Sequence, residues 1–160
     1  MSETSTVREL LMAELALAVR TTGALLEKVT PELWGFRPRE EMRTVLELAN
    51  HLTQIPLVDL AILQERSQEE VHALEQALSA SDAPHMRANM ENGLNELSAY
   101  MSGLSEHDFL HKQSKPFYME HGSTQAKWLV EIVTHAFHHR AQLFTYLKES
   151  GVAINMFDLY

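Results

Sequence analysis

Cysteine is absent from this sequence of 160 residues. The chain can therefore form no disulfide bond, offers no thiolate to a metal ion and carries no cysteine nucleophile. The lack of cysteine fits a reducing compartment. The first residues, MSETSTVREL, are polar and acidic, unlike the basic and then apolar pattern of a secretory signal. We expect a cytoplasmic protein.

Basic residues are also few: 13 Lys and Arg stand against 22 Asp and Glu, and the formal net charge is −9 with neutral histidines. Nucleic-acid binders gain most of their affinity from basic side chains that contact phosphates, so this charge argues against DNA or RNA. It argues equally against an anionic membrane surface, and no apolar run approaches the roughly 20 residues that span a bilayer. The expected partner is a small-molecule substrate, with no nucleic acid and no membrane.

Glycine and proline are scarce, at 6 and 5 residues, while hydrophobic residues make up 45% of the chain. This balance favours long helices over turn-rich β structure, and apolar residues recur with helical spacing in four stretches. The predicted long helices cover residues 6–29, 44–65, 82–104 and 123–150, and a short connector helix covers residues 67–78. Together they predict an all-α fold, a four-helix bundle that forms a single domain over residues 1–160.

Local signals set the expected ends of these helices. Capping boxes, in which Ser or Thr is followed three residues later by Glu, begin at Thr6, Thr44 and Ser67. Pro56 lies within the second helix and predicts a kink there. Gly151 predicts the end of the last helix.

The remaining segments are assigned structural roles. Trp34 and Phe36, in the linker over residues 30–43, are expected to close one end of the bundle. Residues 105–122 show no helical period, and the apolar tail, VAINMFDLY, is expected to pack back onto the helices. The methionine-rich stripe of the fourth long helix is assigned to the core; it comprises Met86, Met90, Leu94, Leu97, Met101 and Leu104.

Nine histidines are many for a chain of this length. Five of them fall in the connector helix, at a helix start or in the long irregular region, where a solvated side chain is the simplest interpretation. These five are His72, His85, His107, His111 and His121.

Three other histidines lie on apolar helix faces. His135 and His139 are four residues apart in the last helix, so both side chains lie at one edge of its apolar stripe, whereas His138 falls on the polar side. His51 lies within the apolar stripe of the second helix. A buried histidine requires partners for its ring nitrogens, because an unsatisfied buried polar group costs ~1–3 kcal/mol. We predict that His51, His135 and His139 converge on one divalent metal ion.

The residue types at this site limit which metal ions it can bind. Three neutral imidazoles suit Zn²⁺, Ni²⁺ or Fe²⁺ better than Mg²⁺ or Ca²⁺, and three protein ligands leave positions for water or substrate, as in catalytic zinc sites. Asp59 falls near the same face of the second helix; we favour a solvated carboxylate, with a role beside the metal as the alternative. The sequence contains no GxSxG, phosphate-binding glycine loop, HExxH or ExxH pair, so no further catalytic residue is assigned.

The segments LELANHL around His51, THAFHHRAQLFTYLKESG around His135 and His139, and the closing NMFDLY resemble the DinB/YfiT-like superfamily of four-helix-bundle metalloproteins. The resemblance covers essentially the whole chain. It implies one divalent ion, often nickel or zinc, held by the three histidines at these positions, and a homodimer. Relatives in this superfamily include thiol-dependent S-transferases and a thiol-dependent maleylpyruvate isomerase, which use mycothiol, bacillithiol or glutathione.

The leading hypothesis is therefore a metal-dependent transferase that acts with a low-molecular-weight thiol, for which no protein nucleophile is required. One alternative is a metal-dependent hydrolase, which would act without any added thiol. Another is a stress-related metal-binding bundle without catalysis, in which the ion mainly stabilises the fold. In that last case removal of the metal would collapse the bundle, whereas a catalytic centre would leave the helices largely intact.

Overall fold

The computed structural model describes residues 2–160, and most of this part of the chain is helical. Its helices are α1 (Glu3–Leu26), α2 (Val45–Leu63), α3 (Gln68–Leu78), α4 (Ala83–Gly103), α5 (Glu106–His111) and α6 (Gln125–Glu149). Two single-turn 3₁₀ helices, η1 (Pro31–Leu33) and η2 (Met156–Leu159), and two short strands complete the described elements. The predicted all-α bundle with a short connector helix is confirmed.

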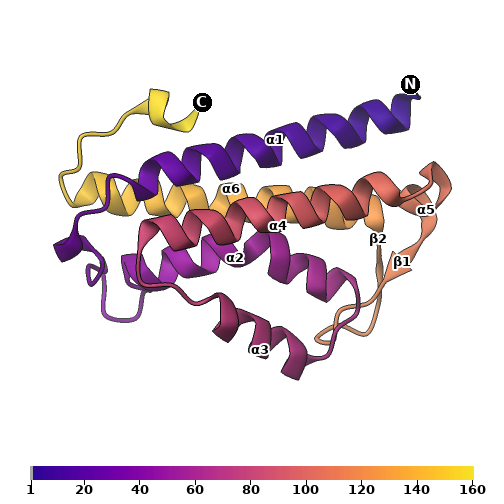
Figure 1. Cartoon of the computed structure of the whole chain (residues 1–160), viewed down its shortest axis with the longest axis horizontal. Helices are drawn as coiled ribbons and strands as arrows, with labels where there is room; N and C mark the ends of the chain where they lie inside the picture. The colour runs from indigo at the N-terminus through magenta and orange to yellow at the C-terminus, as the bar shows by residue number, and fades with distance from the viewer. Residues whose placement is uncertain (1) are drawn as a thin grey trace.

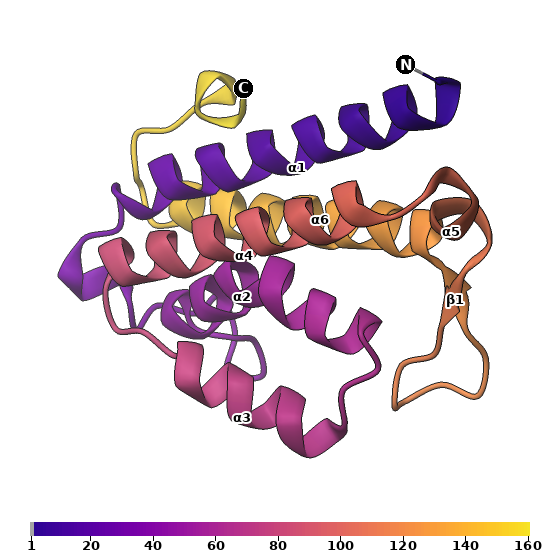
Figure 2. The same cartoon turned by 45° about the vertical axis from the view of Figure 1, so that its right-hand side comes forward.

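The four long helices, α1, α2, α4 and α6, pack together as the bundle, and Figure 1 shows their arrangement. Helices α1 and α6 run in one direction, and α2 and α4 run in the other, with α3 as the crossover that joins α2 to α4 (Figures 1 and 2). The packed pairs are α1 with α6, α2 with α4, α2 with α6, and α1 with α4. Each long helix therefore packs against two others, which buries its apolar stripe in a shared core.

Capping side chains begin most of the helices, as the sequence predicts. Full capping boxes are present at Thr44 with Glu47 and at Ser67 with Glu70. The predicted start of α1 at Thr6 is wrong, because Ser2 caps the helix by accepting from the backbone N–H of Ser5. Thr6 lies inside the helix, where its hydroxyl donates to the carbonyl of Ser2 at 3.0 Å.

One predicted helix end differs from the structure, and another is confirmed. Helix α1 ends at Leu26, three residues before the predicted end at Val29, because Thr30 and Pro31 turn the chain into η1. At the end of α6, Gly151 adopts φ 81°, the left-handed conformation expected of a residue that stops a helix.

The core between α2 and α4 depends on a close approach of the two backbones. A Cβ atom at Gly93 would lie 2.9 Å from the backbone nitrogen of Leu57 and 3.1 Å from Cβ of Pro56. Pro56 lies inside α2, as expected. The predicted methionine stripe is core: Met86, Met90, Leu97 and Met101 are buried, and Leu94 and Leu104 pack against them.

The linker aromatics close one end of the bundle, as predicted. Trp34 and Phe36 are partly buried against the main core. The Phe36 ring meets the ring of Tyr146 edge to face, with 6.2 Å between centroids. The linker is tied to the start of α2 because the N–H of Val45 donates to the carbonyl of Phe36 at 2.8 Å.

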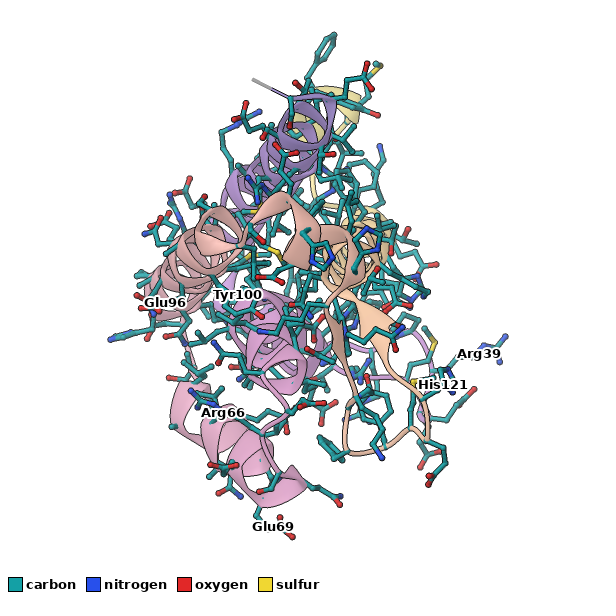
Figure 3. All side chains as sticks on the ribbon, turned by 90° about the vertical axis from the view of Figure 1, so that its right-hand side faces the viewer. Arg39, Arg66, Glu69, Glu96, Tyr100 and His121 are labelled. Atoms are coloured by element: carbon teal, nitrogen blue, oxygen red, sulfur yellow. The ribbon has the colours of Figure 1, made fainter. Side chains whose placement is uncertain are left out.

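Residues 105–122 contain structure that periodicity did not reveal. They hold the six-residue α5 and the strand β1 (Gln113–Ser114), which pairs antiparallel with β2 (Ser123–Thr124). These elements are too short to show an apolar period. They are held by Gln125, fully buried, which donates to Ser114 Oγ at 2.8 Å and accepts from the Tyr100 hydroxyl at 2.7 Å. Tyr100 is partly buried against the main core, and in the end-on view His121 marks the hairpin loop outside the bundle (Figure 3).

The apolar tail packs back onto the bundle, as predicted. Ile154 is buried, and η2 contacts α1. The tail is held by the buried Arg140, whose Nη1 donates to the carbonyl of Leu159 at 3.0 Å. Across the described residues, none of the helices combines the length and the apolar character that a membrane crossing requires.

Candidate metal centre

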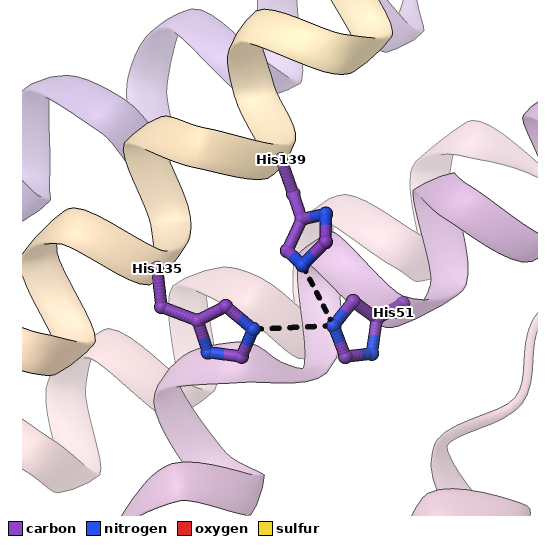
Figure 4. Close-up of side chains that lie close together, drawn as sticks. All are labelled: His51, His135 and His139. Carbon is purple, nitrogen blue, oxygen red and sulfur yellow. Dashed lines mark hydrogen bonds between the residues drawn. The ribbon is translucent and has the colours of Figure 1, made fainter.

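Three histidine rings converge between α2 and α6 (Figure 4). Nε2 of His51 lies 3.2 Å from Nε2 of His135 and 3.0 Å from Nε2 of His139. One nitrogen from each ring lies within 4.8 Å of the other two. Three nitrogen atoms bound to one ion at ~2.0–2.1 Å in tetrahedral geometry would be about 3.3 Å apart. The spacing of the rings is therefore compatible with a single divalent ion.

The helices position these side chains by simple geometry. His135 and His139 are one turn apart on α6 and face the same side, and His51 comes from α2, which packs against α6. His139 is buried, with 7% of its surface exposed, while His51 and His135 are partly buried. His138, beside them in sequence, is exposed, as its place on the polar side predicts.

The outer nitrogens of two rings have hydrogen-bond partners. Nδ1 of His135 lies 2.9 Å from Oδ2 of Asp59, and Nδ1 of His139 lies 2.7 Å from Oε1 of Gln142. Asp59 is mostly buried, with 15% of its side chain exposed. The favoured interpretation of Asp59 as solvated is wrong. The sequence left its direction open because Pro56 lies between Asp59 and His51 and disturbs the helical phase.

These outer contacts indicate where the ring protons lie. An ionised carboxylate only accepts, so Nδ1 of His135 carries the proton. With the amide oxygen of Gln142 turned toward it, Nδ1 of His139 carries the proton too, and Nε2 of each ring then presents a lone pair. Both lone pairs point at Nε2 of His51, which holds at most one proton. One of the two contacts therefore has no proton while the outer bonds are kept. A cation at the centre would accept lone pairs from Nε2 of all three rings, so the residues present fit a metal ion.

Comparison with known proteins identifies the family. The sequence model of the DinB family matches residues 1–160. This chain belongs to the DinB family. No protein of curated function matches the chain.

Solved structures with the same fold include other DinB proteins. A candidate member of the DinB family from Exiguobacterium sibiricum is 24% identical, with a TM-score of 0.81 over 100% of this chain and 99% of its own. A DinB-like protein from Bacillus subtilis is 19% identical, with a TM-score of 0.67 over 90% of this chain and 94% of its own. A DinB-like protein from Bacillus cereus is 15% identical, with a TM-score of 0.69 over 91% and 93%. At these identities the likeness establishes the DinB fold alone.

Burial keeps two imidazoles of this DinB centre, those of His51 and His139, neutral. Loss of solvent, followed by the neighbouring His139, lowers the pKa of His51 from 6.5 to about 3. Burial likewise lowers the pKa of His139 from 6.5 to about 4. The pKa of Asp59 is raised, first by burial, although its bond to His135 acts in the opposite direction. Neutral imidazole is the form that binds metal ions, so both histidines are available as ligands well below neutral pH.

The other predicted histidine positions in this DinB chain are on the surface. All five are exposed, in agreement with the sequence interpretation: His72, His85, His107, His111 and His121. The residue that sequence analysis missed is Gln142, for which a signal existed. It lies three residues after His139 on the same helix, a spacing that allows side-chain contact.

Proposed function

We propose that this DinB-family protein binds one divalent metal ion through Nε2 of His51, His135 and His139 and acts as a metal-dependent transferase with a low-molecular-weight thiol. The observation that carries the metal site is the convergence of three Nε2 atoms from two helices. Nε2 of His51 lies 3.2 Å from that of His135 and 3.0 Å from that of His139. The proposed transferase chemistry rests on the family resemblance and on the positive charge and open coordination position of an ion held by three histidines.

The donor set favours zinc or nickel, with iron as a further candidate. Three imidazole nitrogens suit borderline divalent ions, and all three donors are neutral. The oxygen-rich shells that Mg²⁺ and Ca²⁺ require are not offered by these rings. The ion therefore keeps its positive charge, which favours an anionic external ligand such as a thiolate.

The chain leaves room for that ligand. Three protein donors leave at least one coordination position open, and 34% of the His135 side chain is exposed, so the centre is reachable from solvent. Because the protein has no cysteine, any thiolate at the centre comes from a small molecule. A bound divalent ion would supply Lewis acidity, which lowers the pKa of such a thiol. The protein's own residues hold the rings and limit water on the side of the buried His139.

Elemental analysis of the purified protein tests the metal site. We expect about one zinc, nickel or iron per chain in the wild type and loss of that metal in His139→Ala. His138→Ala is the matched control, because it removes the adjacent exposed histidine from the same helix turn. Absence of stoichiometric metal in the wild type, even after incubation with each ion, would overturn the proposal.

A second measurement tests the chemistry. The metal-loaded protein is mixed with an alkylating electrophile, with and without mycothiol, bacillithiol or glutathione, and the thioether product is quantified. A transferase forms the thioether faster than the thiol and the electrophile do without protein, and His139→Ala shows no such acceleration. Turnover of ester or amide substrates without thiol would instead indicate the hydrolase.

We also propose that the protein is a homodimer. The support is an apolar groove of about 560 Å³ where α1, α5 and α6 meet, lined in part by Val7, Leu110 and Val130. These three side chains are 53%, 42% and 44% exposed, and an exposed apolar patch of this kind favours association. Light scattering should give a dimer for the wild type and a monomer for Val130→Glu; a monomeric wild type would refute the dimer.

A further inference from the structure

The two outer hydrogen bonds of the centre differ in kind. The ring of His135 is bonded to the carboxylate of Asp59, whereas the ring of His139 is bonded to the amide of Gln142. An ionised carboxylate can only accept a hydrogen bond. A side-chain amide can accept through its oxygen or, after a half-turn, donate through its nitrogen. Only the carboxylate therefore dictates which nitrogen of its partner ring carries the proton.

The two bonds also differ in their place in the fold. Gln142 lies on α6, three residues after His139, so the partner moves together with the ring that it holds. Asp59 lies on α2, the helix that also carries His51, while His135 lies on α6. Both ring nitrogens of His135 therefore contact side chains on α2. Its Nε2 contacts Nε2 of His51, and its Nδ1 contacts the carboxylate of Asp59.

We infer that Asp59 is the positioning residue of the centre: it fixes His135 in the Nδ1–H form and sets the direction of its Nε2 lone pair, while Gln142 only adapts to His139. The link to metal affinity rests on the proposed metal site. The statement about the ring proton does not, because it concerns the protein without metal. A histidine ligand held by a carboxylate in this way is both oriented and made a stronger donor.

Burial strengthens the hold of Asp59 on the ring. The Asp59 side chain is 15% exposed, so water cannot readily replace it beside His135. Because the amide of Gln142 can either accept or donate, it does not dictate the ring proton of His139. Loss of the Asp59 carboxylate should therefore disturb the centre more than loss of Gln142.

Glu131 provides a matched control for charge. It lies one turn before His135 on α6, and its charge acts on Asp59. Its side chain is 48% exposed and forms an ion pair with Lys127 instead of contacting a ring of the centre. Glu131→Gln thus removes one negative charge near the centre without removing a hydrogen bond to histidine.

The test measures ring protonation first. Long-range ¹⁵N–¹H spectra of the metal-free protein at neutral pH distinguish the Nδ1–H form from the Nε2–H form. We expect His135 to be in the Nδ1–H form in the wild type, in Gln142→Ala and in Glu131→Gln, and to shift toward Nε2–H in Asp59→Asn. A wild-type His135 in the Nε2–H form, or an Asp59→Asn spectrum identical to wild type, would overturn the inference.

The second readout is zinc affinity, measured by competition with a chromogenic chelator. Asp59→Asn should bind about 10–100-fold more weakly, Gln142→Ala should lose less, and Glu131→Gln should change by less than about fivefold. Equal losses of zinc affinity in Asp59→Asn and Glu131→Gln would show that Asp59 acts only through its negative charge. If the wild type binds no metal but His135 is in the Nδ1–H form, the proposed function fails and the positioning role of Asp59 stands.

Thermal unfolding of the metal-free variants separates positioning from folding. A buried carboxylate is expensive to desolvate, so replacing it by the neutral, isosteric Asn should leave the metal-free melting temperature unchanged or higher. A variant that binds zinc weakly yet melts like the wild type has lost positioning. A large fall in the metal-free melting temperature of Asp59→Asn would show that Asp59 serves mainly to hold α2 against α6, and would contradict the inference.

Discussion

Nε2 of His51 lies 3.0 Å from Nε2 of His139, although 88 residues separate them along the chain. Helices α2 and α6 pack against each other, and both contribute to the main apolar core, with Leu52 and Ala136 among their buried side chains. Burial of this core favours the approach of the two helices that carry the rings. We therefore expect the fold to form without the ion.

Removal of metal should leave the helices intact. After dialysis against a chelator we expect the far-ultraviolet circular dichroism to be essentially unchanged, while zinc at 100 times its Kd should add about 2.7 kcal/mol to the free energy of unfolding. Urea titrations with and without zinc measure the gain, and His51→Ala should show none. Collapse of the dichroism signal on chelation would support the non-catalytic, structural interpretation of the metal.

Stability of the metal-free protein should fall as the pH is lowered from about 6.5. The folded-state pKa of His51 is about 3 and that of His139 about 4, both below the ordinary value of 6.5. In this interval the unfolded chain binds more protons than the folded one, so unfolding is favoured as the pH falls. Asp59, whose pKa is raised, acts in the opposite direction above its ordinary value of 3.8. Urea midpoints at pH 7 and pH 5 measure the change, and His51→Gln should lose less over this range than the wild type does. An equal loss in both proteins would contradict the assignment.

Gly93→Ala should destabilise the bundle by about 1–3 kcal/mol, because the added methyl group would lie 2.9 Å from the backbone nitrogen of Leu57. Gly103→Ala, at the end of the same helix, is the matched control, since a Cβ atom there has no neighbour within 4 Å. It should be neutral or stabilising by up to ~1 kcal/mol. Denaturant unfolding of both variants checks the contrast, and equal stability of the two would show that α2 and α4 are less closely packed.

Arg140→Met should release the C-terminal tail. Arg140 is buried and donates to Thr21 Oγ1 at 2.9 Å and to the carbonyl of Leu159 at 3.0 Å, so it joins α6, α1 and the tail. We expect faster hydrogen exchange over residues 152–160 and a loss of about 1–3 kcal/mol in unfolding free energy. Lys28→Met is the comparison: it removes the more exposed ion pair with Asp158, at 2.6 Å, which should cost less than ~1 kcal/mol. Unchanged exchange in Arg140→Met would contradict the anchoring role.

Much of the bundle could be read from the sequence because its signals are local. The capping boxes at Thr44 and Ser67 and the stop at Gly151 depend on backbone groups within a few residues. The helical period of the apolar residues likewise identifies which face of each helix is buried. Ser2 was missed as a cap because a second capping pattern, at Thr6, lies one turn later.

The short elements of residues 105–122 could not be read in this way. A helix of six residues and strands of two residues carry too few positions for a period, and they are held by distant partners. The buried Gln125 is one such partner: it contacts Tyr100 on α4 and Ser114 in β1. Contacts between residues this far apart in the chain leave no pattern of neighbouring residues from which they can be predicted.

The sequence by itself determined the helices, their buried faces and the histidines those faces carry, because each depends on residue spacing within one helix. It thereby determined that His51, His135 and His139 would lie on interior surfaces. Only the tertiary structure decided how far apart their Nε2 atoms are, and which side chains take the outer nitrogens. The direction of Asp59 depends on the path of α2 beyond Pro56 and on its distance from α6. Both result from the packing of whole helices and not from the pattern of any one of them.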